Sequence, residues 1–354
     1  MRDKYLSALI GLGLAMLPPA PGLAQDQVRV VASLPTYGAI AREIVGDRGE
    51  VKSIARGDEN PHFVRPKPSY VVMLRDADVF VTTGLDLELW VPTLLDKANN
   101  RKIKEGGPGY VTAYTNVRLL DVPAAASREA GDIHIYGNPH IHTDPINAIV
   151  VSRNILVGLE RASPENAEYF AERQREFELR VLVALFGDEL LKLFGRQTLF
   201  ELANSDGWWK FLSTNEYDGR PLTDYVGGWL AAAAAFRGRE MVCYHMLWAY
   251  FTQRFQVACS VFVESKPGIP PSPRHVEEVL DIMNARDIPA VLAANFWDAR
   301  KVRNIAERGK AEVVFVPEHV GGEEGIDTYF ELVDAWVARL DSAFSPNAAT
   351  GGGR

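Results

Sequence analysis

The sequence has few of the features that would place it in a specialised class. Only two of its 354 residues are cysteines, which excludes a disulfide-dense miniprotein. Its 38 lysines and arginines are outnumbered by 46 acidic residues, and the resulting net charge of −8 argues against nucleic acid as a partner. After residue 24 no apolar run is long enough to cross a bilayer.

What remains is the composition of an ordinary globular protein. Hydrophobic residues make up 47% of the chain and charged residues 24%. A chain of this length is expected to form two domains.

The N-terminus has the three parts of a secretory signal peptide. Arg2 and Lys4 precede an apolar run, Leu6 to Leu17, and small residues follow up to Ala24. A buried helix is the alternative, but two prolines after the run would end it. We therefore expect cleavage after residue 24, with no cysteine nearby for a lipid anchor. The mature protein is then expected to be exported and soluble, in a bacterial periplasm. At the other end of the chain, residues 345–354 are expected to form a disordered tail.

Strand and helix patterns alternate along the chain. This alternation predicts an α/β fold of two lobes, each with a parallel sheet flanked by helices. We expect an N-terminal lobe over 25–162, a long helix over 163–187, and a C-terminal lobe over 188–344 with a helical insertion at 188–239. The long helix is either a rigid link between the lobes or an ordinary packed helix. Expected strands are 28–34, 51–55, 78–82, 241–244, 257–263, 288–293 and 312–316, and 106–132 is expected to be mostly loop.

Cys243 and Cys259 each lie within a predicted strand. In an oxidising compartment such a pair favours a disulfide, and two separately buried thiols are the alternative.

Side chains that can bind metal gather where predicted strands end. His62 and His245 each follow a strand, and His319 and Asp327 follow the last one. Ligands bind outside the carboxyl ends of parallel strands, so these residues could meet in a cleft between the lobes. Three imidazoles and one carboxylate suit tetrahedral Zn²⁺. Spacing alone is a weak signal, because each histidine could equally be a solvated loop residue.

Ordered motifs strengthen this hypothesis. They are Asn60-Pro61-His62, the run 77–88, Asn138-Pro139-His140-Ile141-His142-Thr143-Asp144-Pro145, Tyr244-His245, Glu264 with Pro267-Gly268, and Asp327-Thr328-Tyr329. Together they resemble, in the same order, the zinc- and manganese-binding solute-binding proteins of ABC importers, the cluster A-I (ZnuA/TroA-like) family.

The resemblance implies two α/β lobes joined by one long helix, and one Zn²⁺ per chain. The implied ligands are His62, His140, His245 and Asp327, with His319 and Glu264 competing for the fourth position. His142 stands where the family motif has tryptophan, and we expect it at the surface. In zinc-binding members a His- and acid-rich loop often precedes the second ligand. Here that region, which includes His134, has few histidines and acidic residues.

The implied function is high-affinity capture of zinc, in preference to manganese, and its delivery to a membrane permease. The protein is then not an enzyme and is monomeric, and a periplasmic metallochaperone is a further candidate partner. One alternative is an exported zinc hydrolase with Glu264 or Glu318 as general base, although no HExxH or GxSxG motif is present. Another is a metal-free adhesin or scaffold.

Overall fold

The computed structural model describes residues 27–123, 134–264 and 269–345. The expected signal peptide and residues 346–354 of the expected tail lie outside these ranges. In the ranges described, no helix is both long and apolar enough to cross a membrane.

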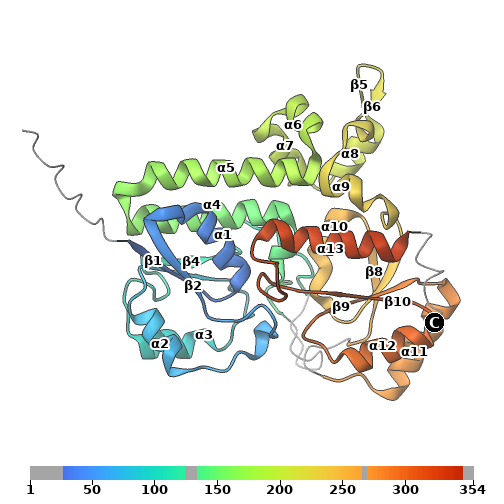
Figure 1. The fold of residues 1–354 in the computed structure, drawn as a ribbon, viewed down its shortest axis with the longest axis horizontal. Helices are drawn as coiled ribbons and strands as arrows, with labels where there is room; N and C mark the ends of the chain where they lie inside the picture. Colours follow the sequence, from blue (N-terminus) through green and yellow to red (C-terminus); the bar gives the residue numbers. More distant parts are fainter. Residues whose placement is uncertain (1–26, 124–133, 265–268, 346–354) are drawn as a thin grey trace, which may run out of the picture.

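The N-terminal lobe is a parallel sheet with helices on its faces (Figure 1). Its strands pair in the order β2-β1-β3-β4. The central strands are continuous β-branched and apolar runs because helices cover both of their faces. The elements are β1 (Val28–Ala32), α1 (Pro35–Val45), β2 (Gly49–Ser53), α2 (Pro68–Arg75), β3 (Val79–Thr82), α3 (Val91–Ala98) and β4 (Tyr110–Thr112).

The C-terminal lobe repeats this architecture. Its parallel sheet has the order β10-β9-β7-β8, which, counted from β7, is the same strand order as in the first sheet. Such a sheet has a switch point between its first and third strands, where ligands commonly bind. The elements are β7 (Glu240–Cys243), α10 (Ala249–Phe255), β8 (Ala258–Phe262), α11 (Pro273–Arg286), β9 (Ala290–Ala294), α12 (Ala299–Arg308), β10 (Glu312–Val316) and α13 (Tyr329–Phe344).

The predicted α/β class with two parallel sheets is confirmed, and each predicted strand lies within about two residues of an observed one. Within 106–132, which was expected to be mostly loop, the structure has one strand that was not predicted, β4 (Tyr110–Thr112). This strand has three residues and pairs only with β3, so it leaves almost no periodic signal in its glycine-rich surroundings. Helix α2 was not predicted either.

Two long helices lie side by side along the N-terminal lobe. Helix α4 (Pro145–Ala162) begins at Asp144, whose carboxylate accepts the backbone N–H of Ile146. Helix α5 (Ala167–Phe186) is the predicted long helix, about 30 Å in length, and it extends toward the segment that precedes β7 (Figure 1). Buried Glu178 on α5 joins them by accepting from Arg153 of α4 at 2.9 Å.

Short elements fill the region that the sequence described only as helix-like in pieces. They are α6 (Asp188–Phe194), α7 (Arg196–Ala203), α8 (Trp208–Thr214), the hairpin of β5 (Glu216–Tyr217) and β6 (Arg220–Pro221), and α9 (Gly228–Ala232). Arg196 of α7 also donates to Glu178, at 2.6 Å, so this region is tied to α5.

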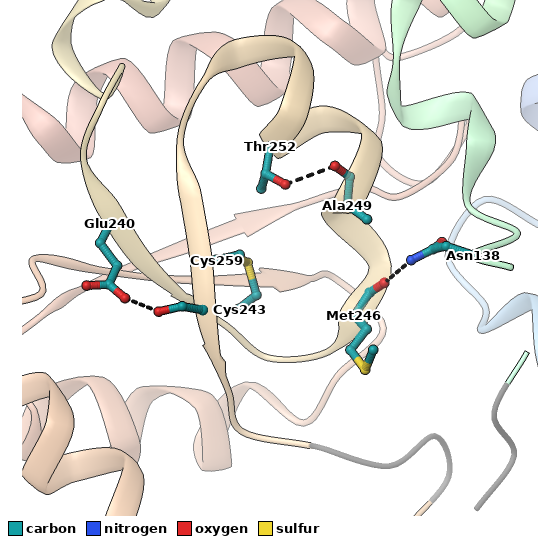
Figure 2. Close-up of a disulfide and its surroundings, with 8 residues drawn as sticks. Asn138, Glu240, Cys243, Met246, Ala249, Thr252 and Cys259 are labelled. Carbon is teal, nitrogen blue, oxygen red and sulfur yellow. Dashed lines mark hydrogen bonds between the residues drawn. A yellow bond between two sulfur atoms is a disulfide. The ribbon is translucent and has the colours of Figure 1, made fainter. Parts of the chain in front are cut away.

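Polar contacts join the two lobes. Arg254 of α10 donates to both carboxylate oxygens of Asp144, at 2.8 and 2.9 Å, and both side chains are buried. Asn138 donates to the backbone carbonyl of Met246 at 2.9 Å (Figure 2). Both contacts hold the start of α4 against the turn after β7. They therefore fix two of the histidine-bearing segments relative to each other.

The two cysteines form a disulfide that joins β7 to β8 (Figure 2). Their Cα atoms are 5.8 Å apart and the residues are 16 apart in sequence. The predicted disulfide is therefore confirmed. It links the strand that leads directly to His245 with its neighbour.

Replacing both cysteines by serine is expected to lower the free energy of unfolding by about 3 kcal/mol, because a loop of this length is no longer closed in the unfolded chain. Urea unfolding of the oxidised protein and the variant measures this difference. Reduction of the wild type should reproduce the variant's midpoint. An unchanged midpoint after reduction would contradict the prediction.

Candidate metal centre

Six of the seven histidines converge between the lobes. Five of them form a chain of neighbouring rings, with centroid separations from 4.5 to 6.4 Å: His62, His134, His140, His142 and His319. The sixth, His245, interacts electrostatically with His62 and Glu318. His275 lies elsewhere, with its ring nitrogen 2.9 Å from the carbonyl of Phe262.

Three of these histidines form what we call the outer trio, which is His62, His134 and His140. Their nearest ligand atoms all lie within 4.8 Å of one another. His62 sits in a short 3-10 helix, Pro61–Phe63, whose preceding residue Asn60 accepts the backbone N–H of His62 at 3.0 Å. His140 is held in the same way by Asn138, also at 3.0 Å. An Asn-Pro-His sequence thus positions both ligands by the same local turn.

His245 approaches from the C-terminal lobe. It follows β7 at the carboxyl end of the sheet, as predicted, and it is buried. Its Nδ1 lies 3.3 Å from the backbone carbonyl of Glu264. A carbonyl only accepts, so this contact favours a proton on Nδ1 and leaves Nε2 as the atom that can bind metal.

Glu318 is the carboxylate at the centre of the histidines. It comes two residues after β10 and is completely buried. Its Oε1 lies 2.8 Å from Nδ1 of His140, which joins the C-terminal lobe to the outer trio. Because Nδ1–H donates to this carboxylate, Nε2 of His140 is unprotonated and free for a metal. That Nε2 is buried and has no hydrogen-bond partner among the described residues.

The structure does not bring Asp327 to this cluster. Asp327 is exposed, and its backbone N–H donates to Glu331 in the first turn of α13. The chain turns outward between Glu318 and Asp327, with left-handed glycines at Gly321 and Gly325. Among the described residues, Glu318, and not Asp327, is the carboxylate grouped with histidines. The sequence pointed to His319 and Asp327 after this strand and to Glu318 only as a general base, although Glu318 follows the same strand end.

The expectation that His142 lies at the surface was wrong. His142 is completely buried, and its ring stacks on that of His319 with centroids 4.5 Å apart. Tyr329 donates a hydrogen bond to its backbone carbonyl at 2.9 Å. Thr143 donates to the carbonyl of His140, and this short helical turn directs His140 and His142 into the interior together.

Burial keeps the histidines neutral. It lowers the pKa of His62 to about 2, with a further contribution from neighbouring His140, and it lowers those of His142 and His245 to about 4. Burial also depresses the pKa values of His140 and His319 well below the ordinary value. The same burial raises the pKa of Glu318 to about 7. Neutral imidazoles are the form that coordinates metal, so the site is prepared for a cation at neutral pH.

Acid is expected to destabilise the metal-free protein between pH 6.5 and 4. In the unfolded chain a histidine takes up a proton near pH 6.5, whereas in the folded protein the five histidines with lowered pKa values stay neutral. Each of these five therefore lowers the free energy of unfolding by about 1.4 kcal/mol for every pH unit below 6.5. Glu318 has the opposite sign. Its raised folded pKa stabilises the fold as the pH falls from 7 toward 4.5, and offsets about one histidine.

Urea unfolding of chelator-treated protein at pH 7, 6 and 5 measures this dependence. His275→Ala, which removes the one histidine outside the cluster, should show the same slope as the wild type. A stability that is constant or rises toward pH 5 would contradict the assignment of neutral buried histidines.

Comparisons with known proteins identify the family and the fold. The family model described as "Zinc-uptake complex component A periplasmic" matches residues 30–184 and 223–343, and the unmatched stretch between them contains helices α6, α7 and α8. The iron-binding protein YfeA of Yersinia pestis is 23% identical over 92% of this chain and 88% of its own length. The high-affinity zinc uptake protein ZnuA of Bacillus subtilis is 25% identical over 43% of this chain, and the match spans only 47% of that relative.

A solved structure shares the fold. The crystal structure of ZnuA superimposes with a TM-score of 0.65 at 17% identity, covering 90% of this chain and all of that one. None of these comparisons supports the alternative of a zinc hydrolase. The family model covers well over half of the sequence, and the chain belongs to the family of periplasmic zinc-uptake components of ABC importers.

Proposed function

We propose that this protein captures one zinc ion at the outer trio and His245 and delivers it to the permease of an ABC importer. The observation that carries the proposal is the convergence of His62, His134, His140 and His245 from both lobes. A cation held between lobes can alter their relative position, which a permease could recognise.

The donor set supports zinc in preference to manganese. Four neutral imidazole nitrogens suit a borderline ion such as Zn²⁺, whereas Mn²⁺ prefers carboxylate, carbonyl and water oxygens. Glu318 contributes its charge through Nδ1 of His140, an arrangement that orients a histidine ligand and increases its basicity. The relatives are named for different metals, zinc and iron, so the chemistry of the donor set carries the choice here.

The position of Glu318 does not support a role as the general base of a hydrolase. Glu318 is completely buried and bonded to His140, so it cannot reach a water molecule on the outer side of the trio as a general base would. We therefore propose a binding protein without enzymatic activity.

The remaining parts of the proposal concern organisation. The chain works as an exported monomer after cleavage following residue 24, with lobes at 25–162 and 188–344 linked by 163–187. The segment 188–239, most of which the family model omits, is a surface on which a permease or a periplasmic metallochaperone could dock.

His245→Ala tests whether the C-terminal lobe supplies a ligand. Losing a direct ligand should weaken zinc binding at least as much as losing an outer partner of a ligand, which costs about 10–100-fold. Competition titration against a zinc chelator measures the change, with manganese titrated in parallel and His275→Ala as the matched control. Zinc affinity equal to that of the control would rule out His245, and tighter manganese than zinc binding would overturn the metal assignment.

Glu318→Gln and Asp327→Asn separate the two candidate carboxylates. Each substitution removes one negative charge and leaves the size of the side chain almost unchanged. The first should weaken zinc binding by about 10–100-fold because His140 loses its anionic partner. The second should leave it unchanged because Asp327 is exposed and belongs to neither group of potential ligands. The reverse order in the same competition titration would return the role to Asp327.

A further inference from the structure

A second group of potential ligands lies behind the outer trio. It consists of His142, Glu318 and His319, which we call the inner trio, and its ligand atoms lie within 4.8 Å of one another. All three side chains are completely buried, whereas two members of the outer trio are only partly buried. From Oε1 of Glu318, Nε2 of His142 is 4.0 Å away and Nε2 of His319 is 3.8 Å away.

Each member of the inner trio has a buried polar atom without a hydrogen-bond partner in the described part of the chain. These atoms are Nδ1 of His142, Oε2 of Glu318 and Nε2 of His319. Leaving three such buried atoms unsatisfied is costly, at about 1–3 kcal/mol each. Three of them on neighbouring side chains indicate that a component is missing here.

The hydrogen bonds that are made favour lone pairs at the unsatisfied atoms. Nε2 of His142 lies 3.2 Å from the backbone carbonyl of Glu318, so it donates there and Nδ1 carries no proton. Nδ1 of His319 lies 2.9 Å from the hydroxyl of Thr36, which also accepts the N–H of Val320. When Nδ1 of His319 donates to Thr36, Nε2 of His319 is likewise unprotonated.

A cation satisfies such a set better than water does. One water molecule has two protons to donate, whereas a divalent ion can accept all three lone pairs at once. The ligand atoms of a tetrahedral zinc, with bonds of about 2.0–2.1 Å, are about 3.3 Å apart. The ligand atoms of the inner trio lie within 4.8 Å of one another, so they approach by up to about 1.5 Å when they bind one ion.

The surroundings are suited to a permanently dry site. The rings of Tyr37 and Trp336 lie 6.3 and 6.5 Å from that of His142, and both side chains are buried. Two histidines and one carboxylate are a donor set for borderline divalent ions. His140 of the outer trio contacts Glu318 of the inner trio through its Nδ1. Cations bound at the two trios would therefore share the negative charge of one carboxylate.

We propose that the inner trio of His142, Glu318 and His319 is a second zinc-binding site, distinct from the capture site and sharing Glu318 with it. The inference goes beyond the proposed function but rests on it in one respect, because the capture site sets the charge that the inner site must tolerate. A second cation would replace the cost of the unsatisfied inner atoms with coordination.

Zinc content per chain tests this proposal. The purified chain is dialysed against buffered free zinc, and bound metal is counted by elemental analysis and native mass spectrometry. Wild type is expected to hold two zinc ions. In His319→Asn the side-chain amide can still donate to Thr36 as Nδ1 does, but no atom replaces Nε2. This variant should hold one zinc ion. His142→Gln keeps a donor to the carbonyl of Glu318 and should also hold one.

Two further variants separate the sites. His62→Ala should lose the outer ion and keep the inner one, and His275→Ala should keep both. A thermal melt of each variant shows that it is folded. A Co²⁺-substituted sample gives an independent spectroscopic signature, because the two sites have different donor sets.

The outcomes distinguish the two proposals. A single wild-type zinc that His62→Ala removes and His319→Asn keeps would overturn the inner site and leave the proposed function standing. A single zinc with the opposite pattern would support the inner site and overturn the capture site. Two ions that persist in both His319→Asn and His142→Gln would overturn the inner site, and no zinc at all would overturn both.

Discussion

The contact between Glu318 and His140 is the interaction on which the architecture of the site depends. It joins the end of the last strand in one lobe to the start of α4 in the other. Both side chains are completely or almost completely buried. A buried carboxylate without a partner would be expensive, so this contact favours one relative position of the lobes. The ion pair of Asp144 with Arg254 supports the same position nearby.

The matching strand order of the two sheets explains why the ligands meet. Each sheet has its switch point between the strands that come first and third in its own lobe, and residues beyond the carboxyl ends of strands gather there. His245 follows the first strand of its sheet, and Glu318 follows the last. When two such sheets face each other across a cleft, their loops form one shared site. The disulfide between β7 and β8 then stabilises the strand that carries His245.

Crowding six histidines into one interior carries a cost that a metal can offset. Five of them have depressed pKa values, so the fold gains nothing from their charge, and several ring nitrogens in the group have no hydrogen-bond partner among the described residues. Binding an ion to the folded state adds stability in proportion to the logarithm of its concentration over its dissociation constant. Features that weaken the metal-free protein are therefore the same ones that favour tight capture.

Local sequence was sufficient for the elements and for several of the site residues. Apolar β-branched runs marked the strands, positions after strands marked His62 and His245, and the Asn-Pro-His motif of the family resemblance marked His140. The two cysteines in neighbouring strands were also enough to predict the disulfide, now seen between β7 and β8. Each of these patterns depends on residues close in the chain, where geometry is set by the backbone itself.

Only the tertiary structure decided which side chains complete the site. It placed His134 beside His62 and His140, it buried His142, and it placed Glu318 rather than Asp327 among the histidines. These choices depend on how loops turn, for example at Gly321 and Gly325, and on how the lobes pack. No local pattern records a distance between residues 178 positions apart, such as His140 and Glu318. The sequence by itself determined the fold and most of the candidate ligands, and packing determined the carboxylate and the inner trio, because burial and convergence are properties of the folded chain alone.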